Sequence, residues 1–571
     1  MKLQKPKFWV KVFVVVFIFA TFGFLTVADE ADTYNSKLHS QNTLNSKLPH
    51  FFDNEPNDVL AEKIADSMSE EELLAQVFMF GWAGQNPGDL LIDWVKTGLG
   101  SIKIFGWNTG NTKKLASSIY LLQSRALKTR FGIPLFVATD QEGGLVRHVK
   151  GLTTETPGNL AIGASGVPMD AYYSGYYISK ELSAIGINLN FAPTVDLYTN
   201  HNSSVIGPRS FGDTPEIAAT LGEAFVRGSR VAGVLTTAKH FPGHGDTSFD
   251  SHGRLPLIDI SKETFYHREL IPFKRLIDAG VPVVMAGHLD FPCLEAGGKP
   301  ATFSKKIMGD LLRKELGFKG LIITDDIMMY GAINYAGNVT RAVTLAIEAG
   351  NDIIESSTTP RKYQSFWTEN LRKMKTDTNF RARVKDSALR ILKIKLDYFK
   401  NSNHVQILPD IENIQKHVPA KDGYPFFQSL AARAVTVFEK SQLPYKPSET
   451  ESIILASEYE NFLLIGKRRF PKAQTTSLID AIYARCRYAD TVIFCISNQN
   501  SLEVFQNLQR QYPEKKYIII SGLSPVYLKT VRNVEAALAV YSYSDFSFIA
   551  GFAALCGDYE ATGTFPLSGI E

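Results

Sequence analysis

The chain has 571 residues, of which 44% are hydrophobic, so it is long enough to bury large cores and to form more than one domain. Its 61 basic and 58 acidic residues give a formal net charge of +3, and its sequence has no basic stripe interleaved with aromatic residues. Nucleic acid is therefore excluded as the expected partner, because nucleic-acid-binding surfaces require clustered positive charge.

The N-terminus predicts transport out of the cytoplasm. An apolar run at 12–28 follows the lysines at positions 2, 5, 7 and 11. Residues 1–28 are therefore either a cleaved signal peptide or an uncleaved anchor, with 8–28 as the membrane tether. Residues 29–55, rich in Asn, Ser and Asp, are expected to form a flexible tether. Since lysines stay on the cytoplasmic side, we expect an exported protein, periplasmic or on the cell surface.

Residues 56–395 are predicted to form one barrel domain. Ser69 and Glu72 make a capping box that begins a helix, after which short apolar runs alternate with amphipathic stretches. The apolar runs that we interpret as strands are 77–80, 101–105, 134–138, 188–191, 234–238, 282–285, 320–323 and 352–354. Strands that alternate with helices over this length predict a parallel sheet closed into a (β/α)8 TIM-type barrel.

A second, smaller domain is expected after the barrel. Residues 396–425, which contain three prolines among polar residues, are interpreted as a linker. Residues 426–571 alternate again, with strands expected at 435–438, 452–456, 491–496, 517–521 and 536–541. This pattern predicts an α/β sandwich. The domain has no dense polar cluster in its sequence.

Polar residues follow several predicted barrel strands directly. They are Asp140, Asp196, the pair Lys239 and His240, His288 and Asp325. Because the carboxyl ends of barrel strands meet at one rim, where barrel active sites gather, these residues are predicted to share one site. The four cysteines at positions 293, 486, 495 and 556 have no C-x-x-C spacing, so neither a metal site nor a disulfide framework is expected. No cofactor is expected.

The loop from Lys239 to His252 has the densest group of titratable residues. Its sequence, KHFPGHGDTSFDSH, contains three histidines beside Gly and Pro. Asp250 lies two residues before His252, so its carboxylate can bind one ring nitrogen while the other exchanges a proton with a substrate. We interpret Asp250 and His252 as a proton-transfer dyad.

This loop resembles the signature of glycoside hydrolase family 3, in the β-N-acetylglucosaminidase (β-N-acetylhexosaminidase) branch that uses a His/Asp dyad. Four further segments resemble the family in the same order: TDQEGG at 139–144, NFAPTVD at 190–196, GPRSFG at 207–212 and ITDD at 323–326. The resemblance covers residues from about 60 to 400. The tail at 557–567 is similar to the end of the family's second domain.

The resemblance implies the catalytic roles. Asp325 would be the nucleophile that forms a glycosyl-enzyme, His252 the acid and base, and Asp250 its partner. An aspartate in this position can instead cap the next helix, but Asp326 is available for that role.

The resemblance also assigns sugar binding to Asp140, Arg209, Lys239 and His240. Relatives usually place an arginine one position after Arg147, so either Arg147 or His148 would fill that place. Asp196 and His288 are expected to support the site from behind.

The expected function is hydrolysis of terminal β-N-acetylglucosaminides from cell-wall muropeptides or chitin-like fragments. One alternative is a non-catalytic surface carbohydrate-binding protein, but both Asp325 and His252 are present. Another is a β-glucosidase of the same family, whose proton donor would come from the second domain. The aglycone, the choice of water or phosphate as acceptor, and the oligomeric state stay open.

Overall fold

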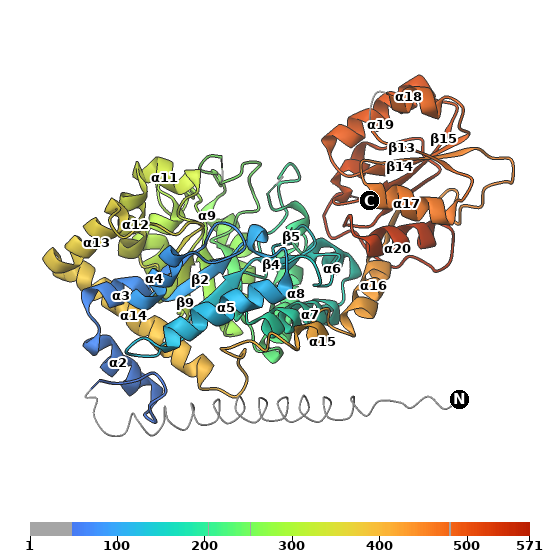
Figure 1. Ribbon diagram of the computed structural model, residues 1–571. Coiled ribbons are helices and arrows are strands. Elements are labelled where there is room, and N and C mark those ends of the chain that lie inside the picture. The colour runs from blue at the N-terminus through green and yellow to red at the C-terminus, as the bar shows by residue number, and fades with distance from the viewer. Residues whose placement is uncertain (1–47, 204, 252, 479–480, 571) are drawn as a thin grey trace, which may run out of the picture.

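The computed structural model describes residues 48–203, 205–251, 253–478 and 481–570, which form two domains (Figure 1). The expected signal or anchor at 8–28 lies outside these residues, as does the expected tether up to residue 47. Among the helices that this description covers, none has both the length and the apolar character needed to cross a bilayer.

The first domain is a parallel barrel, as predicted. Its eight strands follow the order β10-β1-β2-β3-β6-β7-β8-β9, and every neighbouring pair is parallel. A bridge between Ile323 and Ile353 joins β9 to the start of β10 and closes the ring. The strands are β1 Phe78–Phe80, β2 Ser101–Ile104, β3 Phe136–Thr139, β6 Leu189–Asn190, β7 Leu235–Phe241, β8 Val283–Ala286, β9 Leu321–Thr324 and β10 Ile354–Ser356.

Helices surround the barrel and bury their apolar faces against its strands (Figure 1). The predicted capping box is present, because the Ser69 side chain accepts from the Glu72 amide and the Glu72 carboxylate accepts from the Ser69 amide. The principal helices are α2 Asn57–Ser67, α3 Glu70–Gln76, α4 Asp89–Thr97, α5 Thr112–Leu127, α6 Asn159–Ser165, α7 Pro168–Ile185, α8 Pro215–Val231, α10 Leu270–Asp278, α11 Tyr330–Ala336, α12 Val339–Ala349, α13 Ser365–Thr376 and α14 Thr378–Phe399.

The second domain is an α/β sandwich, which confirms the predicted class. Its six-stranded sheet has the order β11-β16-β15-β14-β12-β13, and β11 pairs antiparallel with β16. The strands are β11 Thr436–Glu439, β12 Ile453–Ala456, β13 Gln474–Thr476, β14 Thr491–Ile496, β15 Lys516–Ser521 and β16 Ala536–Ala539. The helices include α17 Glu460–Arg469, α18 Ala481–Cys486, α19 Gln499–Gln511 and α20 Asp545–Leu555. The sequence analysis missed β13, a short and polar edge strand.

The second domain lies beside the barrel loops that follow β3 and β6. Helix α16, Gly423–Ala434, packs against both α6 and α20 and so joins the domains (Figure 1). The C-terminal tail adds backbone contacts: the Thr564 amide donates to the Ala164 carbonyl at 2.9 Å, and the Asp213 amide donates to the Pro566 carbonyl at 3.2 Å. These contacts fix one side of the barrel rim.

A buried carboxylate fastens the last helix of the barrel. Asp352, which is fully buried before β10, accepts from Arg383 at 3.0 Å, from Arg390 at 2.6 Å and from Arg313. Burial alone would raise the pKa of Asp352, but the three guanidinium groups lower it overall. The carboxylate is therefore ionised at neutral pH and ties α14 to the sheet.

We predict that Asp352→Asn lowers the free energy of unfolding by about 3 to 5 kcal/mol, because three partly buried arginines lose their counter-charge. Urea denaturation followed by circular dichroism measures this loss. The matched control is Asp386→Asn, since the Asp386 side chain is 55% exposed and also binds Arg390. This control should change stability by less than about 1 kcal/mol. Equal losses in the two variants would contradict the role of Asp352.

Candidate active site

The site lies at the carboxyl ends of the barrel strands. Asp140 directly follows β3, and Asp325 directly follows β9. Lys239 and His240 belong to β7 itself, which extends to Phe241, beyond the expected end at residue 238. All of these residues lie at the same rim, as the parallel topology requires.

A buried ion network forms the floor of the site. The Lys239 ammonium lies 2.6 Å from Asp140 and 2.5 Å from Glu142. Asp140 also binds Lys103, with Nζ 2.6 Å from Oδ2. Glu142 forms a bidentate pair with Arg209, at 2.9 Å and 2.7 Å. Three cations and two carboxylates, drawn from β2, β7 and the loops after β3 and β6, therefore hold one another in place.

This network keeps both carboxylates ionised. Burial would raise the pKa of Asp140, but the charges of Lys103 and Lys239 hold it well below its ordinary range. Burial opposes ionisation of Glu142 too, yet Arg209 and Lys239 lower its pKa to about 2. A carboxylate has about four acceptor positions, so Asp140 can accept ligand hydroxyl groups in addition to its lysines.

Asp196 orients His240 from behind. The two side chains meet with Nδ1 and Oδ2 2.7 Å apart, and the Asp196 carboxylate also accepts the backbone amides of His240 and His244. Burial would raise the pKa of Asp196, but His240 and these hydrogen bonds lower it overall. Nδ1 of His240 therefore donates to Asp196, and Nε2 lies 3.4 Å from Arg209 Nη2, toward the ion network.

Asp325 and its neighbour Asp326 have different contacts. Asp326 accepts the backbone amides of Met328 at 3.0 Å and Ser357 at 3.1 Å, so it stabilises the turn after β9. Asp325 accepts the Asp326 amide at 2.8 Å. Burial would raise the pKa of Asp325, but the nearby His240 and the hydrogen bond from the Asp326 amide lower it overall. Asp325 is thus an ionised carboxylate beside the cluster, which a nucleophile requires.

His288 supports the peptide that carries these aspartates. It is fully buried, and burial lowers its pKa, so the ring is neutral. Nε2 lies 3.0 Å from the Asp326 carbonyl and Nδ1 lies 2.9 Å from the Thr302 hydroxyl. A carbonyl can only accept, so Nε2 carries the proton that it donates to the Asp326 carbonyl.

The side chains of Arg147 and His148 contact different groups. His148 Nδ1 lies 3.7 Å from Asp140 Oδ2, at the edge of the ion network. The Arg147 guanidinium lies 3.8 Å from Glu155 and donates to the Thr153 carbonyl at 3.3 Å. The structure therefore brings His148 to the predicted sugar-binding residues and places Arg147 outside that group.

Of the predicted dyad of Asp250 and His252, the structure describes Asp250. Asp250 lies in an exposed turn, where its carbonyl accepts the amides of Gly253 and Arg254 at 3.1 Å and 3.2 Å. The neighbouring Ser251 carbonyl accepts the Gly331 amide at 3.1 Å, which places this loop against α11. His252 lies outside the described residues. Its pairing with Asp250 stays a prediction.

Three ionisable residues of the site were not assigned a role from the sequence. They are Lys103, Glu142 and Glu355. Lys103 and Glu355 are buried ionisable side chains within apolar strand segments, an arrangement that is costly without a function or a partner and could have identified them. Glu142 belongs to the segment TDQEGG at 139–144. This segment was compared with the family in the sequence analysis, but Glu142 was given no role of its own.

Glu355 is a buried acid beside the nucleophile candidate. It is 1% exposed, and its Oε1 has no hydrogen-bond partner within the described part of the chain. Burial, reinforced by the charges of Asp326 and Asp325, raises its pKa well above the ordinary value despite Lys103. Glu355 therefore holds its proton more tightly than an ordinary glutamate does.

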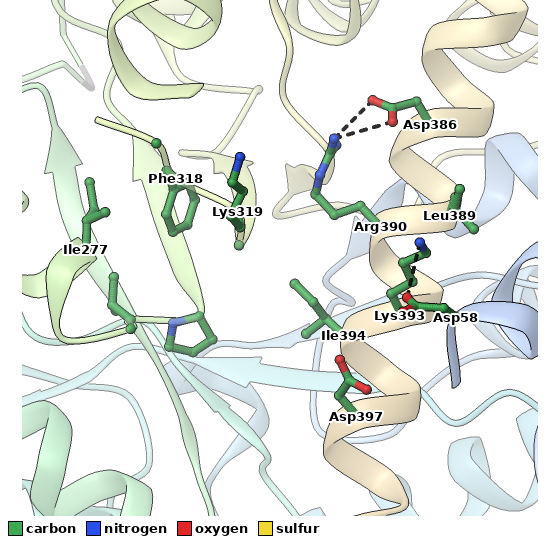
Figure 2. A pocket seen from close by; sticks show the side chains of 15 residues that line it. Asp58, Ile277, Phe318, Lys319, Asp386, Leu389, Arg390, Lys393, Ile394 and Asp397 are labelled. Carbon is green, nitrogen blue, oxygen red and sulfur yellow. Dashed lines mark hydrogen bonds and ion pairs between the residues drawn. The ribbon is translucent and has the colours of Figure 1, made fainter. Parts of the chain in front are cut away.

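A cavity of about 650 Å³ at the opposite end of the barrel has a different character (Figure 2). Pro282 and Gly320, which precede β8 and β9, line it together with α14. Four of its charged side chains form ion pairs: Arg390 with Asp386, and Lys393 with Asp58. None of the predicted site residues lines this cavity.

The chemistry at the rim suits a neutral polyhydroxylated ligand. Ionised carboxylates, ammonium groups and a guanidinium group supply both acceptors and donors around Asp325. In the described ranges, no group of three or more His, Cys, Asp or Glu side chains could hold a metal ion.

Comparisons with known proteins identify similar chains. Residues 72–394 match the family described as "Glycosyl hydrolase family 3 N terminal domain". The chain is 35% identical over 318 residues to Beta-hexosaminidase A of Pseudoalteromonas piscicida, which covers 52% of this chain and 53% of that protein. It therefore spans about half the length of that relative. It is 36% identical over 236 residues to a Beta-hexosaminidase of Actinobacillus pleuropneumoniae serotype 3 (strain JL03), covering 40% of this chain and 67% of the relative.

A solved structure agrees with the fold. The glycoside hydrolase family 3 beta-N-acetylglucosaminidase from Paenibacillus sp. str. FPU-7 aligns with a TM-score of 0.78 at 26% identity. The alignment covers 88% of this chain and 99% of that structure, so it includes both domains.

The raised pKa of Glu355 predicts a pH-dependent stability difference. Because the folded state holds this proton more tightly than the unfolded state, Glu355 costs stability as pH rises above about 4.3, by up to about 1.4 kcal/mol per pH unit. Glu355→Gln removes the titration. We therefore expect the variant to gain stability relative to the wild type between pH 5 and 7, measured by urea denaturation. The exposed Glu369→Gln is the control, and parallel curves for Glu355→Gln and wild type would contradict the prediction.

Proposed function

The chain belongs to glycosyl hydrolase family 3, and from this premise we propose that it is a retaining glycosidase that hydrolyses terminal β-N-acetylglucosaminides. The observation that carries the proposal is the position of Asp325, an ionised carboxylate directly after β9 and beside the network of Asp140, Lys239 and Arg209. Relatives that are about 35% identical are named beta-hexosaminidases, which supports the choice of sugar.

In the proposed reaction, an Asp325 oxygen attacks the anomeric carbon of the substrate. The bond from this carbon to the leaving oxygen breaks, and His252, charged through its pairing with Asp250, gives its proton to that oxygen. His252 then removes a proton from water as the water attacks the same carbon and releases Asp325. The net reaction adds one water across the glycosidic bond.

The ion network is proposed to hold the non-reducing sugar. Asp140 and Lys239 present an acceptor and a donor on one side, and Arg209, His240 and His148 present polar groups around them. Charge-assisted hydrogen bonds of this kind are strong and directional. Cell-wall muropeptides or chitin-like fragments are the proposed natural substrates, and the N-terminal sequence supports export toward them.

We predict that Asp325→Ala abolishes nearly all turnover of chromogenic β-N-acetylglucosaminide while the fold is retained, because no glycosyl-enzyme can form. The measurements are kcat/KM and the thermal unfolding midpoint of the purified variant. Asp278→Ala is the control, since Asp278 is an exposed carboxylate on α10. Substantial residual activity in Asp325→Ala would contradict the assignment, and a wild-type preference for the β-glucoside would contradict the proposed sugar.

We expect His252→Ala to lose about 10²- to 10⁴-fold in rate on substrates with poor leaving groups, which need protonation. Activated aryl substrates should lose much less. The measurement is the rate against leaving-group pKa, together with the pH profile, which should be bell-shaped in the wild type. An equal loss across the series would exclude His252 as the acid.

A further inference from the structure

Trp107 is an exposed aromatic residue at the barrel rim. It follows β2, and its side chain is 53% exposed. Phe105 stacks on the indole, with ring centroids 4.6 Å apart and planes 6° apart. The Trp107 Nε1 donates to the Trp82 carbonyl at 2.8 Å, which fixes the orientation of the ring. The indole is thus held rigidly while much of its surface stays open to solvent.

Trp107 lines an uncharged groove of about 510 Å³. This volume is within the range of about 300 to 1,000 Å³ that is typical of small-ligand sites. The other lining residues are Trp82, Ala83, Gly84, Gly88, Leu90, Leu91, Ser357, Thr358 and Thr359. None of these residues is charged, so apolar surface and a few hydroxyl and backbone groups form the walls.

Contacts on two sides link the residues of the groove to residues of the active site. On one side, Phe105 lies between Trp107 and His148, whose ring is 5.6 Å away and which approaches Asp140. On the other side, the groove residue Ser357 donates its backbone amide to Asp326, the neighbour of Asp325. A substrate whose first sugar occupies the ion network could therefore extend into the groove.

The loops that form the groove are bound together. The Asn108 side-chain amide donates to the Trp82 carbonyl at 3.0 Å and to the Gly84 carbonyl at 2.5 Å, so the loop after β2 holds the loop after β1. Thr359, from the loop after β10, donates its hydroxyl to the Gly81 carbonyl. Because its walls are linked in this way, little conformational entropy is lost when a ligand binds between them.

We propose that this groove is a binding site for an uncharged sugar on the leaving-group side of the scissile bond, with Trp107 stacking on the pyranose ring. The inference rests on the proposed function and adds a substrate preference to it. A flat ring with an apolar face and hydroxyl edges matches an aromatic wall with a few polar groups. A peptide-bearing or carboxylated sugar would find no cation in the groove to pair with its charge.

The test compares Trp107→Ala on substrates of different length. Methyl β-N-acetylglucosaminide has a leaving group too small to reach the groove, whereas N,N′,N″-triacetylchitotriose fills it. We expect kcat/KM for the trisaccharide to fall roughly 3- to 10-fold, the size of one lost aromatic contact, and that for the methyl glycoside to stay within about twofold. Trp107→Phe keeps a ring and should restore most of the activity.

Tyr488→Ala serves as the matched control, because Tyr488 is 80% exposed on the second domain, away from the rim. It should leave both substrates unaffected. Equal effects of Trp107→Ala on the two substrates, or no effect on either, would overturn the proposal. A wild-type preference for N-acetylglucosaminyl-N-acetylmuramic acid over diacetylchitobiose would overturn the uncharged sugar class.

Calorimetric binding of the trisaccharide is measured in parallel, so that the two proposals can fail separately. If the wild-type protein hydrolyses neither substrate, the proposed function fails. Weaker binding to Trp107→Ala than to the wild type would still support the groove, and equal binding would overturn it.

Discussion

The buried ammonium group of Lys239 is the feature on which the site depends. Lys239 is 1% exposed, and the carboxylates of Asp140 and Glu142 both contact its ammonium group. Each carboxylate in turn needs a second cation, which Lys103 and Arg209 supply. Removing one member of such a network leaves a buried charge unpaired, so each member depends on the others being in place. The network therefore links β2 and β7 to the loops after β3 and β6.

Most of the fold could be predicted from the sequence because its strands are short apolar runs that alternate with amphipathic helices. Each expected barrel strand overlaps an observed one, although the observed strands tend to end slightly later, as β7 does at Phe241. This extension includes Lys239 and His240, polar residues that look like loop residues when only hydrophobicity is considered. The edge strand β13, Gln474–Thr476, was missed because it is short and lacks an apolar pattern.

The site residues that belong to sequence motifs could be predicted. The residues that meet only because the strands are ordered around the barrel could not. Asp140, Arg209, Lys239 and His240 lie together as expected. Lys103 and Glu355 lie far apart in the sequence, on β2 and β10, and their proximity depends on how the strands are ordered around the ring. The choice between Arg147 and His148 also required the structure, because adjacent side chains in an extended segment face opposite directions.

The C-terminal tail links the stability of the two domains. Its backbone hydrogen bonds from Thr564 and to Pro566 reach α6 and the loop after Arg209, which belongs to the site. Opening the interface would leave those barrel groups without partners, so part of the energy that keeps each domain folded resides in their contact. The second domain can therefore influence turnover without contacting substrate, by restricting the thermal motion of the loop that carries Arg209.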